Sequence, residues 1–123
     1  MLLDSYAWIE LFLGTEKGKK VKELLEKGKH YISIVSIAEI TEWSLKNKIE
    51  TKNLIDVIKK ISEVINLNEE IVELAGKINF ERKKIIKDWG MLDSLIYATA
   101  LLYNLKILTG DKHFEKLNNV EML

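Results

Sequence analysis

The amino-acid sequence predicts a single α/β domain with a mainly parallel sheet of about four to five strands flanked by helices. Short apolar segments alternate with longer stretches in which apolar residues recur every three to four positions. Of the 123 residues, 47% are hydrophobic, which is enough for one compact core. No linker, internal repeat or low-complexity tract divides the chain. We therefore expect one domain over residues 1–123.

The predicted strands and helices alternate along the whole chain. Apolar and β-branched runs predict the strands, and apolar residues on one face of a helical stretch predict the helices. Gly14 and Gly28 end the first two helices, and Asn68 caps a long one. In order, we expect strand 1–3, helix 5–13, helix 15–27, strand 31–35, helix 37–46, helix 51–61, strand 64–67, helix 69–87, helix 92–105, strand 106–108, helix 111–117 and edge strand 120–123.

The composition excludes several kinds of chemistry. The chain has no cysteine, so disulfides, thiolate zinc sites and cysteine nucleophiles are absent. Its two histidines, His30 and His113, are too few for a histidine-based metal cage. The 19 basic residues balance the 19 acidic ones, which excludes a bulk electrostatic attraction to nucleic acid but leaves room for a local basic patch.

The hydropathy pattern bears on location. No apolar run approaches the roughly 18–20 residues that a membrane-spanning helix needs. The opening segment has an acid at position 4 and lacks the basic start of a secretory signal. We therefore expect a cytoplasmic protein that does not enter a membrane.

Four acidic residues lie at or just past predicted strand ends or helix starts: Asp4, Glu39, Asp93 and Asp111. Each has a structural explanation, because the three aspartates can cap helices, and Ser36 with Glu39 matches a capping box. However, Asp4, Glu39 and Asp111 follow three different strands, so a parallel sheet brings them to one edge. Clustered carboxylates require a proton or a cation, and oxygen ligands of this kind suit Mg²⁺ or Mn²⁺.

The segments around these acids resemble the PIN-domain nucleases, and within them the VapC-type toxins of toxin–antitoxin pairs. They are residues 2–5 (LLDS), 37–39 (IAE), 92–100 (LDSLIYATA) and 108–114 (LTGDKHF), and the resemblance runs in order over essentially the whole chain. It implies a Rossmann-like sheet, endoribonuclease activity, and an Mg²⁺ site in which Mn²⁺ can substitute.

The resemblance also assigns roles to residues. It implies that Asp4, Asp93 and Asp111 hold a metal that polarises the scissile phosphate, and that Glu39 binds a second ion or orients the attacking water. The products would carry a 5′-phosphate and a 3′-hydroxyl. Supporting hydroxyl residues of the family correspond to Ser5 and Thr109. Many relatives have a further acid two residues after the fourth motif acid, where this chain has His113.

Two other functions remain open at this point. One is a PIN-like fold without activity that serves as a binding module. The other is an α/β phosphohydrolase acting on small nucleotides. The basic residues Lys77, Arg82, Lys83 and Lys84 on the long helix are candidates for contact with RNA phosphates, or they form a solvated helix face.

The early helices carry more large apolar residues than one helix face can bury. The first helix contains Trp8, Ile9 and Phe12, and the third contains Trp43. Surplus apolar surface of this kind predicts an interface. The resemblance implies a homodimer, and an antitoxin partner with a segment that buries Trp8 or Trp43 and places a basic side chain among the acids.

Overall fold

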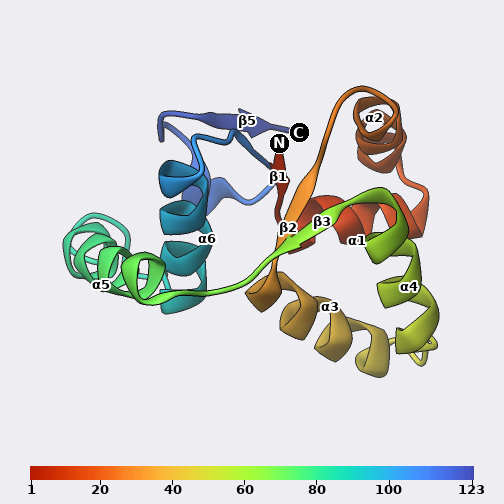
Figure 1. Ribbon diagram of the computed structural model, residues 1–123, viewed down its shortest axis with the longest axis horizontal. Coiled ribbons are helices and arrows are strands. Elements are labelled where there is room, and N and C mark those ends of the chain that lie inside the picture. Colours follow the sequence, from red (N-terminus) through yellow and green to blue (C-terminus); the bar gives the residue numbers. More distant parts are fainter.

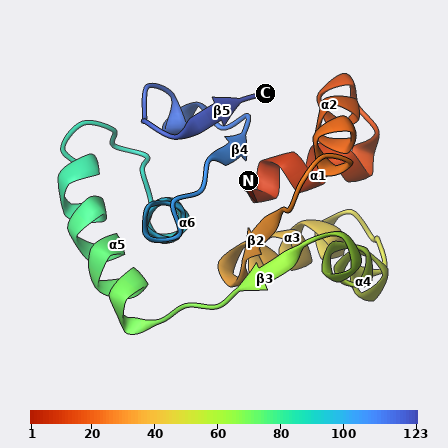
Figure 2. The ribbon, with the colours of Figure 1, turned by 45° about the horizontal axis from the view of Figure 1, so that its top comes forward.

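A computed structural model describes residues 1–123 and contains one sheet of five parallel strands in the order β3-β2-β1-β4-β5 (Figures 1 and 2). The strands are β1 Leu2–Leu3, β2 Tyr31–Ser33, β3 Glu63–Ile65, β4 Ile107–Thr109 and β5 Val120–Met122. The helices are α1 Ser5–Leu13, α2 Glu16–Leu25, α3 Ile34–Lys46, α4 Thr51–Ile61, α5 Glu69–Arg82, α6 Met91–Leu102 and the 3₁₀ turn η1 Lys112–Phe114.

The strand order reverses direction between β1 and β4. The chain proceeds outward from β1 to β2 and β3, then returns through α5 and α6 to place β4 on the other side of β1. In this register Leu2 lies opposite both Tyr31 and Ile107. In parallel α/β sheets, ligand sites form at the carboxyl ends of the strands on either side of such a reversal.

The central strands β1 and β4 are fully buried, and all their residues except Thr109 are apolar. Leu3 and Leu108 pack in a core with residues of α1 to α4, whereas Leu2 and Ile107 pack in a second core with α6. Neighbouring residues of a strand point to opposite faces, which explains this alternation. Figure 1 shows the same division, with α1 to α4 on one side of the molecule and α5 and α6 on the other.

The tryptophans of the early helices differ in burial. Trp8 is fully buried and stacks against Phe12, with 6.2 Å between ring centroids. The prediction that a partner segment could bury Trp8 is therefore wrong, because the domain's own core already does so. Trp43 is half-buried, so only Trp43 retains surface for a partner.

The start of α3 differs from the prediction. The helix begins at Ile34, and its cap is Ser33, whose hydroxyl accepts the Val35 N–H at 3.3 Å. Ser36 is buried inside the helix and its hydroxyl has no partner, so the predicted capping box with Glu39 is wrong. Two serines three residues apart can both cap a helix, and the sequence alone does not distinguish them.

Several other boundaries shift. The long helix ends at Arg82 instead of residue 87, because the chain turns there and brings Trp89 into the core. The helix α6 ends at Leu102, two residues before Asn104 adopts a positive φ of 53°. The expected helix over 111–117 is only the 3₁₀ turn η1. None of the helices combines the length and apolarity needed to cross a membrane.

Candidate active site

Four acidic side chains from four elements come together where β1 and β4 end. Asp4 directly follows β1, and Asp111 lies two residues beyond β4. Glu39 is in the second turn of α3, and Asp93 is in the first turn of α6. They are close enough that the negative charges of Asp93 and Asp111 act on both Asp4 and Glu39.

Asp4 is both a helix cap and a member of this acidic group. It is only 5% exposed, its Oδ1 accepts the Ser5 N–H at 2.8 Å, and its Oδ2 accepts the Thr109 hydroxyl at 2.8 Å. Burial, together with the charges of Asp111 and Asp93, raises the pKa of Asp4 to about 6 in spite of these two hydrogen bonds. The capping role therefore coexists with membership of the acidic group.

Thr109 connects Asp4 to Asp111. Its buried hydroxyl donates to Asp4 and accepts the Asp111 N–H at 3.0 Å. Asp111 Oδ1 in turn accepts the His113 N–H at 2.9 Å and caps η1. The Ser5 hydroxyl lies 3.5 Å from Asp4 Oδ1, so both hydroxyl residues singled out in the sequence contact the acidic group.

Glu39 has one carboxylate oxygen, Oε1, that is buried and has no hydrogen-bond partner. Burial, together with the charges of Asp4, Asp93 and Asp111, raises the pKa of Glu39 to about 7, although a hydrogen bond with the Ser5 side chain acts in the opposite direction. The side chain borders a hollow of about 160 Å³ that is also lined by Glu42. An ionised carboxylate in these surroundings needs a proton or a cation.

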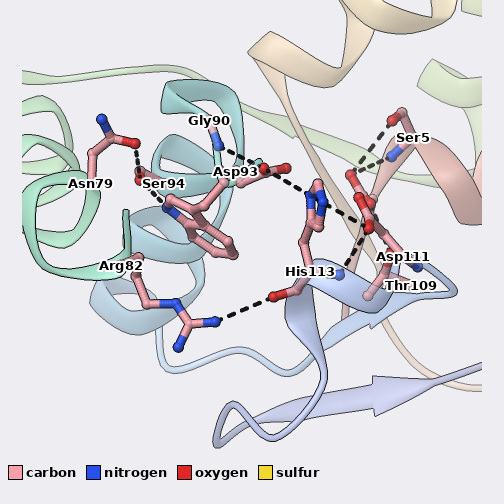
Figure 3. Close-up of polar contacts among 11 residues, drawn as sticks. Ser5, Asn79, Arg82, Gly90, Asp93, Ser94, Thr109, Asp111 and His113 are labelled. Carbon is pink, nitrogen blue, oxygen red and sulfur yellow. Dashed lines mark hydrogen bonds and ion pairs between the residues drawn. The ribbon is translucent and has the colours of Figure 1, made fainter. Parts of the chain in front are cut away.

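Asp93 is not the cap of its helix. The N-cap is Gly90, and Asp93 Oδ2 accepts the Gly90 N–H at 3.0 Å from the third position of α6 (Figure 3). The N-cap interpretation of Asp93 is therefore wrong, since the carboxylate bonds back to the cap residue from inside the helix. Burial raises the pKa of Asp93 more than that hydrogen bond lowers it, and the charge of Asp111 raises it as well.

His113 faces two of the acids. Its Nδ1 lies 3.5 Å from Asp93 Oδ2 and 3.7 Å from Asp111 Oδ1. Potential ligand atoms of Asp93, Asp111 and His113 all lie within 4.8 Å of one another. These three donors, together with the unpartnered Glu39 oxygen and the buried Asp4, fit a divalent cation both in donor type and in negative charge.

A buried polar network adjoins Asp93 and was not predicted from the sequence. Trp89 Nε1 donates to Ser94 Oγ at 2.7 Å, and Ser94 Oγ donates to Asn79 Oδ1 at 3.1 Å (Figure 3). The guanidinium of Arg82 lies over the Trp89 ring at 4.8 Å and donates to the His113 carbonyl at 3.3 Å. The only signal in the sequence was that Arg82 is the single arginine of the chain.

The basic residues of the long helix are placed differently from one another. Lys77, Lys83 and Lys84 are exposed, and Lys77 and Lys84 each pair with a nearby glutamate, at 3.4 and 3.3 Å. Arg82 is half-buried and already bonded within the domain. Contact of these residues with RNA stays a prediction.

Comparison with known proteins identifies the family to which this fold belongs. The sequence profile of the PIN domain matches residues 1–120. The ribonuclease VapC1 of Methanocaldococcus jannaschii is 30% identical over 122 residues, which cover 95% of this chain and 80% of that protein. The chain thus belongs to the PIN domain family, and its similarity lies with the VapC-type members.

Solved structures support the same assignment. A toxin–antitoxin complex from Klebsiella pneumoniae contains a chain with a TM-score of 0.78 and 25% identity, over 98% of this chain and 95% of that one. The VapBC2 complex of Rickettsia felis, bound to a promoter DNA fragment, contains a chain with a TM-score of 0.79 at 19% identity, over 99% and 97% of the two chains. The latter likeness establishes the fold alone.

Proposed function

We propose that this protein is a divalent-metal-dependent endoribonuclease and the toxin of a VapBC-type toxin–antitoxin pair in the cytoplasm. Mg²⁺ would be the cofactor, and Mn²⁺ would substitute for it. The observation that carries the proposal is the convergence of four acids from four separate elements, with burial raising the pKa of Asp4, Glu39 and Asp93. The relationship to a ribonuclease over 95% of the chain supports the same activity.

The four acids and the two hydroxyl residues have different roles in this proposal. Asp4, Asp93 and Asp111 would hold the cation, and Glu39 would hold a second ion or a water molecule. A bound divalent cation supplies charge stabilisation at the scissile phosphate and makes a bound water more acidic. Ser5 and Thr109 keep the Asp4 carboxylate oriented through their contacts with it. No side chain has to act as a nucleophile.

Glu39 is the residue best suited to receive a proton. Its pKa of about 7 is near neutral pH, where a general base works best. Its buried Oε1 is free of protein donors and can accept a hydrogen bond from the attacking water. In-line attack by that water leaves a 5′-phosphate on one product and a 3′-hydroxyl on the other.

Cleavage of a mixed RNA pool tests this proposal. The wild type should cut RNA in Mg²⁺ or Mn²⁺ and lose the activity in EDTA. Asp93→Ala and Asp111→Ala should each abolish cleavage while the far-ultraviolet circular dichroism stays unchanged. Activity that survives EDTA would contradict the proposal. Metal binding without cleavage would favour an inactive binding module, and hydrolysis of small nucleotides alone would favour a phosphohydrolase.

The antitoxin and the homodimer belong to the same proposal. An apolar groove of about 490 Å³ lies between α1, α2 and α4, lined by Phe12, Leu54 and Val57 among others. A groove of this kind suits a partner helix, and the structurally similar Klebsiella pneumoniae chain comes from a toxin–antitoxin complex. A basic side chain from the antitoxin would bind among the acids and stop the reaction.

Two solution measurements address these partners. Sedimentation at micromolar concentration should show a dimer, and a strictly monomeric species would contradict the homodimer. Addition of the antitoxin should shift tryptophan fluorescence to the blue through Trp43, because Trp8 and Trp89 are already fully buried. An unchanged spectrum with undiminished RNA cleavage would contradict the partner assignment.

A further inference from the structure

The geometry points to His113 as a nitrogen ligand of the metal site, so that the site prefers a transition-metal ion such as Mn²⁺ or Co²⁺ to Mg²⁺. This inference rests on the metal site of the proposed function, and it refines which ion that site selects. The argument depends on the position of the imidazole, on how its backbone is held, and on the chemistry of nitrogen ligands.

The distances around Nδ1 suit two ligands of one ion. A charge-assisted N–H···O bond is about 2.7–2.9 Å long. His113 Nδ1 lies farther than that from both carboxylates, at 3.5 Å from Asp93 Oδ2 and 3.7 Å from Asp111 Oδ1. Two donor atoms at about 2.1 Å from a shared ion are roughly 3–4 Å apart, which spans both separations. Figure 3 shows the imidazole directed toward the two acids.

The backbone of His113 is fixed from both sides. Its N–H donates to Asp111 Oδ1 at 2.9 Å, and its carbonyl accepts from the Arg82 guanidinium at 3.3 Å. The next residue, Phe114, is fully buried against Trp89, with 5.2 Å between ring centroids. These contacts hold the backbone of His113 beside the two acids, which places its imidazole within reach of a shared ion.

The ligand type then determines ion preference. Mg²⁺ selects oxygen ligands and keeps several waters, whereas Mn²⁺, Co²⁺ and Zn²⁺ accept imidazole nitrogen more readily. An all-carboxylate site discriminates weakly between Mg²⁺ and Mn²⁺. Replacing one oxygen by the nitrogen of His113 shifts that balance toward the transition metals.

Pulsed electron paramagnetic resonance of the Mn²⁺-loaded protein tests the inference without any RNA. A directly bound imidazole gives a ¹⁴N modulation of the electron spin echo. We expect this modulation in the wild type and not in His113→Asp. The control is His30→Gln, which changes the only other histidine of the chain and should keep the modulation. Circular dichroism checks that each variant is folded.

Competition between ions gives a second readout. Co²⁺ and Mg²⁺ affinities should be compared by displacement of bound Mn²⁺. Loss of an outer partner of a metal ligand already costs roughly 10- to 100-fold in affinity, so His113→Asp should lower the preference for Co²⁺ over Mg²⁺ by at least about tenfold.

The outcomes separate this inference from the proposed function. Bound Mn²⁺ without ¹⁴N modulation, or equal ion preference in wild type and His113→Asp, would overturn the role of His113 and leave the metal site standing. Failure of the wild type to bind Mn²⁺, Co²⁺ or Mg²⁺ would overturn both.

Discussion

The Thr109 hydroxyl donates a 2.8 Å hydrogen bond to Asp4 Oδ2, which joins the last residue of β4 to the residue that directly follows β1. The same oxygen of Thr109 accepts the Asp111 N–H at 3.0 Å. One buried hydroxyl thus sets the separation of two acids that are 107 positions apart in the sequence. The geometry of the acidic group depends on it.

Thr109→Val should destabilise the domain by about 1–3 kcal/mol, because it leaves a buried carboxylate oxygen and a backbone N–H without partners. Thr109→Ser is the matched control and should recover most of the loss, since it keeps the hydroxyl. Urea denaturation of the two variants measures the difference. Equal stabilities of the serine and valine variants would show that the hydroxyl contributes nothing.

Asp4→Asn should change how the stability of the metal-free protein depends on pH. Burial raises the pKa of Asp4 from 3.8 to about 6 in the folded protein, so the folded state holds this proton more tightly than the unfolded state. The stability that the proton contributes is complete below pH 3.8 and is lost as the pH rises through about 6. The loss is on the order of 3 kcal/mol.

Asparagine carries no charge, so the Asp4→Asn variant does not lose this stability as the pH rises. The free energy of unfolding of Asp4→Asn should therefore rise relative to the wild type between about pH 4 and pH 7. At neutral pH without metal the variant should melt at the same temperature or higher, yet gain less from Mn²⁺. Parallel pH curves together with an equal response to Mn²⁺ would contradict the assignment of Asp4 to a charged cluster.

Arg82→Lys should lower both stability and Mn²⁺ affinity. Lysine cannot reproduce the flat contact with Trp89 together with the bond to the His113 carbonyl, so we expect a loss of about 1–3 kcal/mol. The control is Lys77→Gln, whose exposed ion pair with Glu73 contributes less than about 1 kcal/mol. Denaturation and Mn²⁺ titration of both variants measure these effects. Equal stability and equal Mn²⁺ affinity of the two variants would show that the contacts of Arg82 contribute nothing to the site.

Two glycines in helices should respond oppositely to alanine. A methyl group on Gly18 would overlap the backbone carbonyl of Glu10, because α1 and α2 cross closely there. Gly18→Ala should therefore cost about 1–3 kcal/mol. Gly76 has open space around it in the interior of α5, so Gly76→Ala should stabilise by about 0.5–1 kcal/mol. Thermal unfolding distinguishes the two, and effects of the same sign would contradict the packing of α1 on α2.

The sequence predicted the parts of the site that follow from local patterns. Asp4 and Asp111 follow buried apolar strands, and the parallel sheet brings such positions to one edge. The position of Asp93 at this edge of the sheet could not be predicted from the strand pattern alone. Asp93 lies in the first turn of α6, before β4 begins, and does not follow a strand. The capping of α3 by Ser33 and not Ser36 was also hidden, since both serines precede the same apolar run.

Contacts between residues far apart in the chain could not be predicted from the periodicity of the sequence. The bond from Arg82 to the His113 carbonyl joins residues 31 positions apart, and it depends on the chain turning after α5. Sequence periodicity suggested only that Arg82 lay on a charged helix. Trp8 was likewise predicted as a possible contact for a partner, although it packs in the core with residues of α1 to α4 and of the sheet.

The most direct test of the central claim compares Glu39→Gln with Glu42→Gln in RNA cleavage. Both substitutions remove one carboxylate from α3, one helical turn apart. Glu39 lies within the acidic group, whereas Glu42 is exposed and pairs with Lys46 at 3.3 Å. With a labelled RNA pool in Mg²⁺, Glu39→Gln should lose cleavage by at least about 100-fold while Glu42→Gln keeps it. Equal activity of the two folded variants would contradict an active site built on Asp4, Glu39, Asp93 and Asp111.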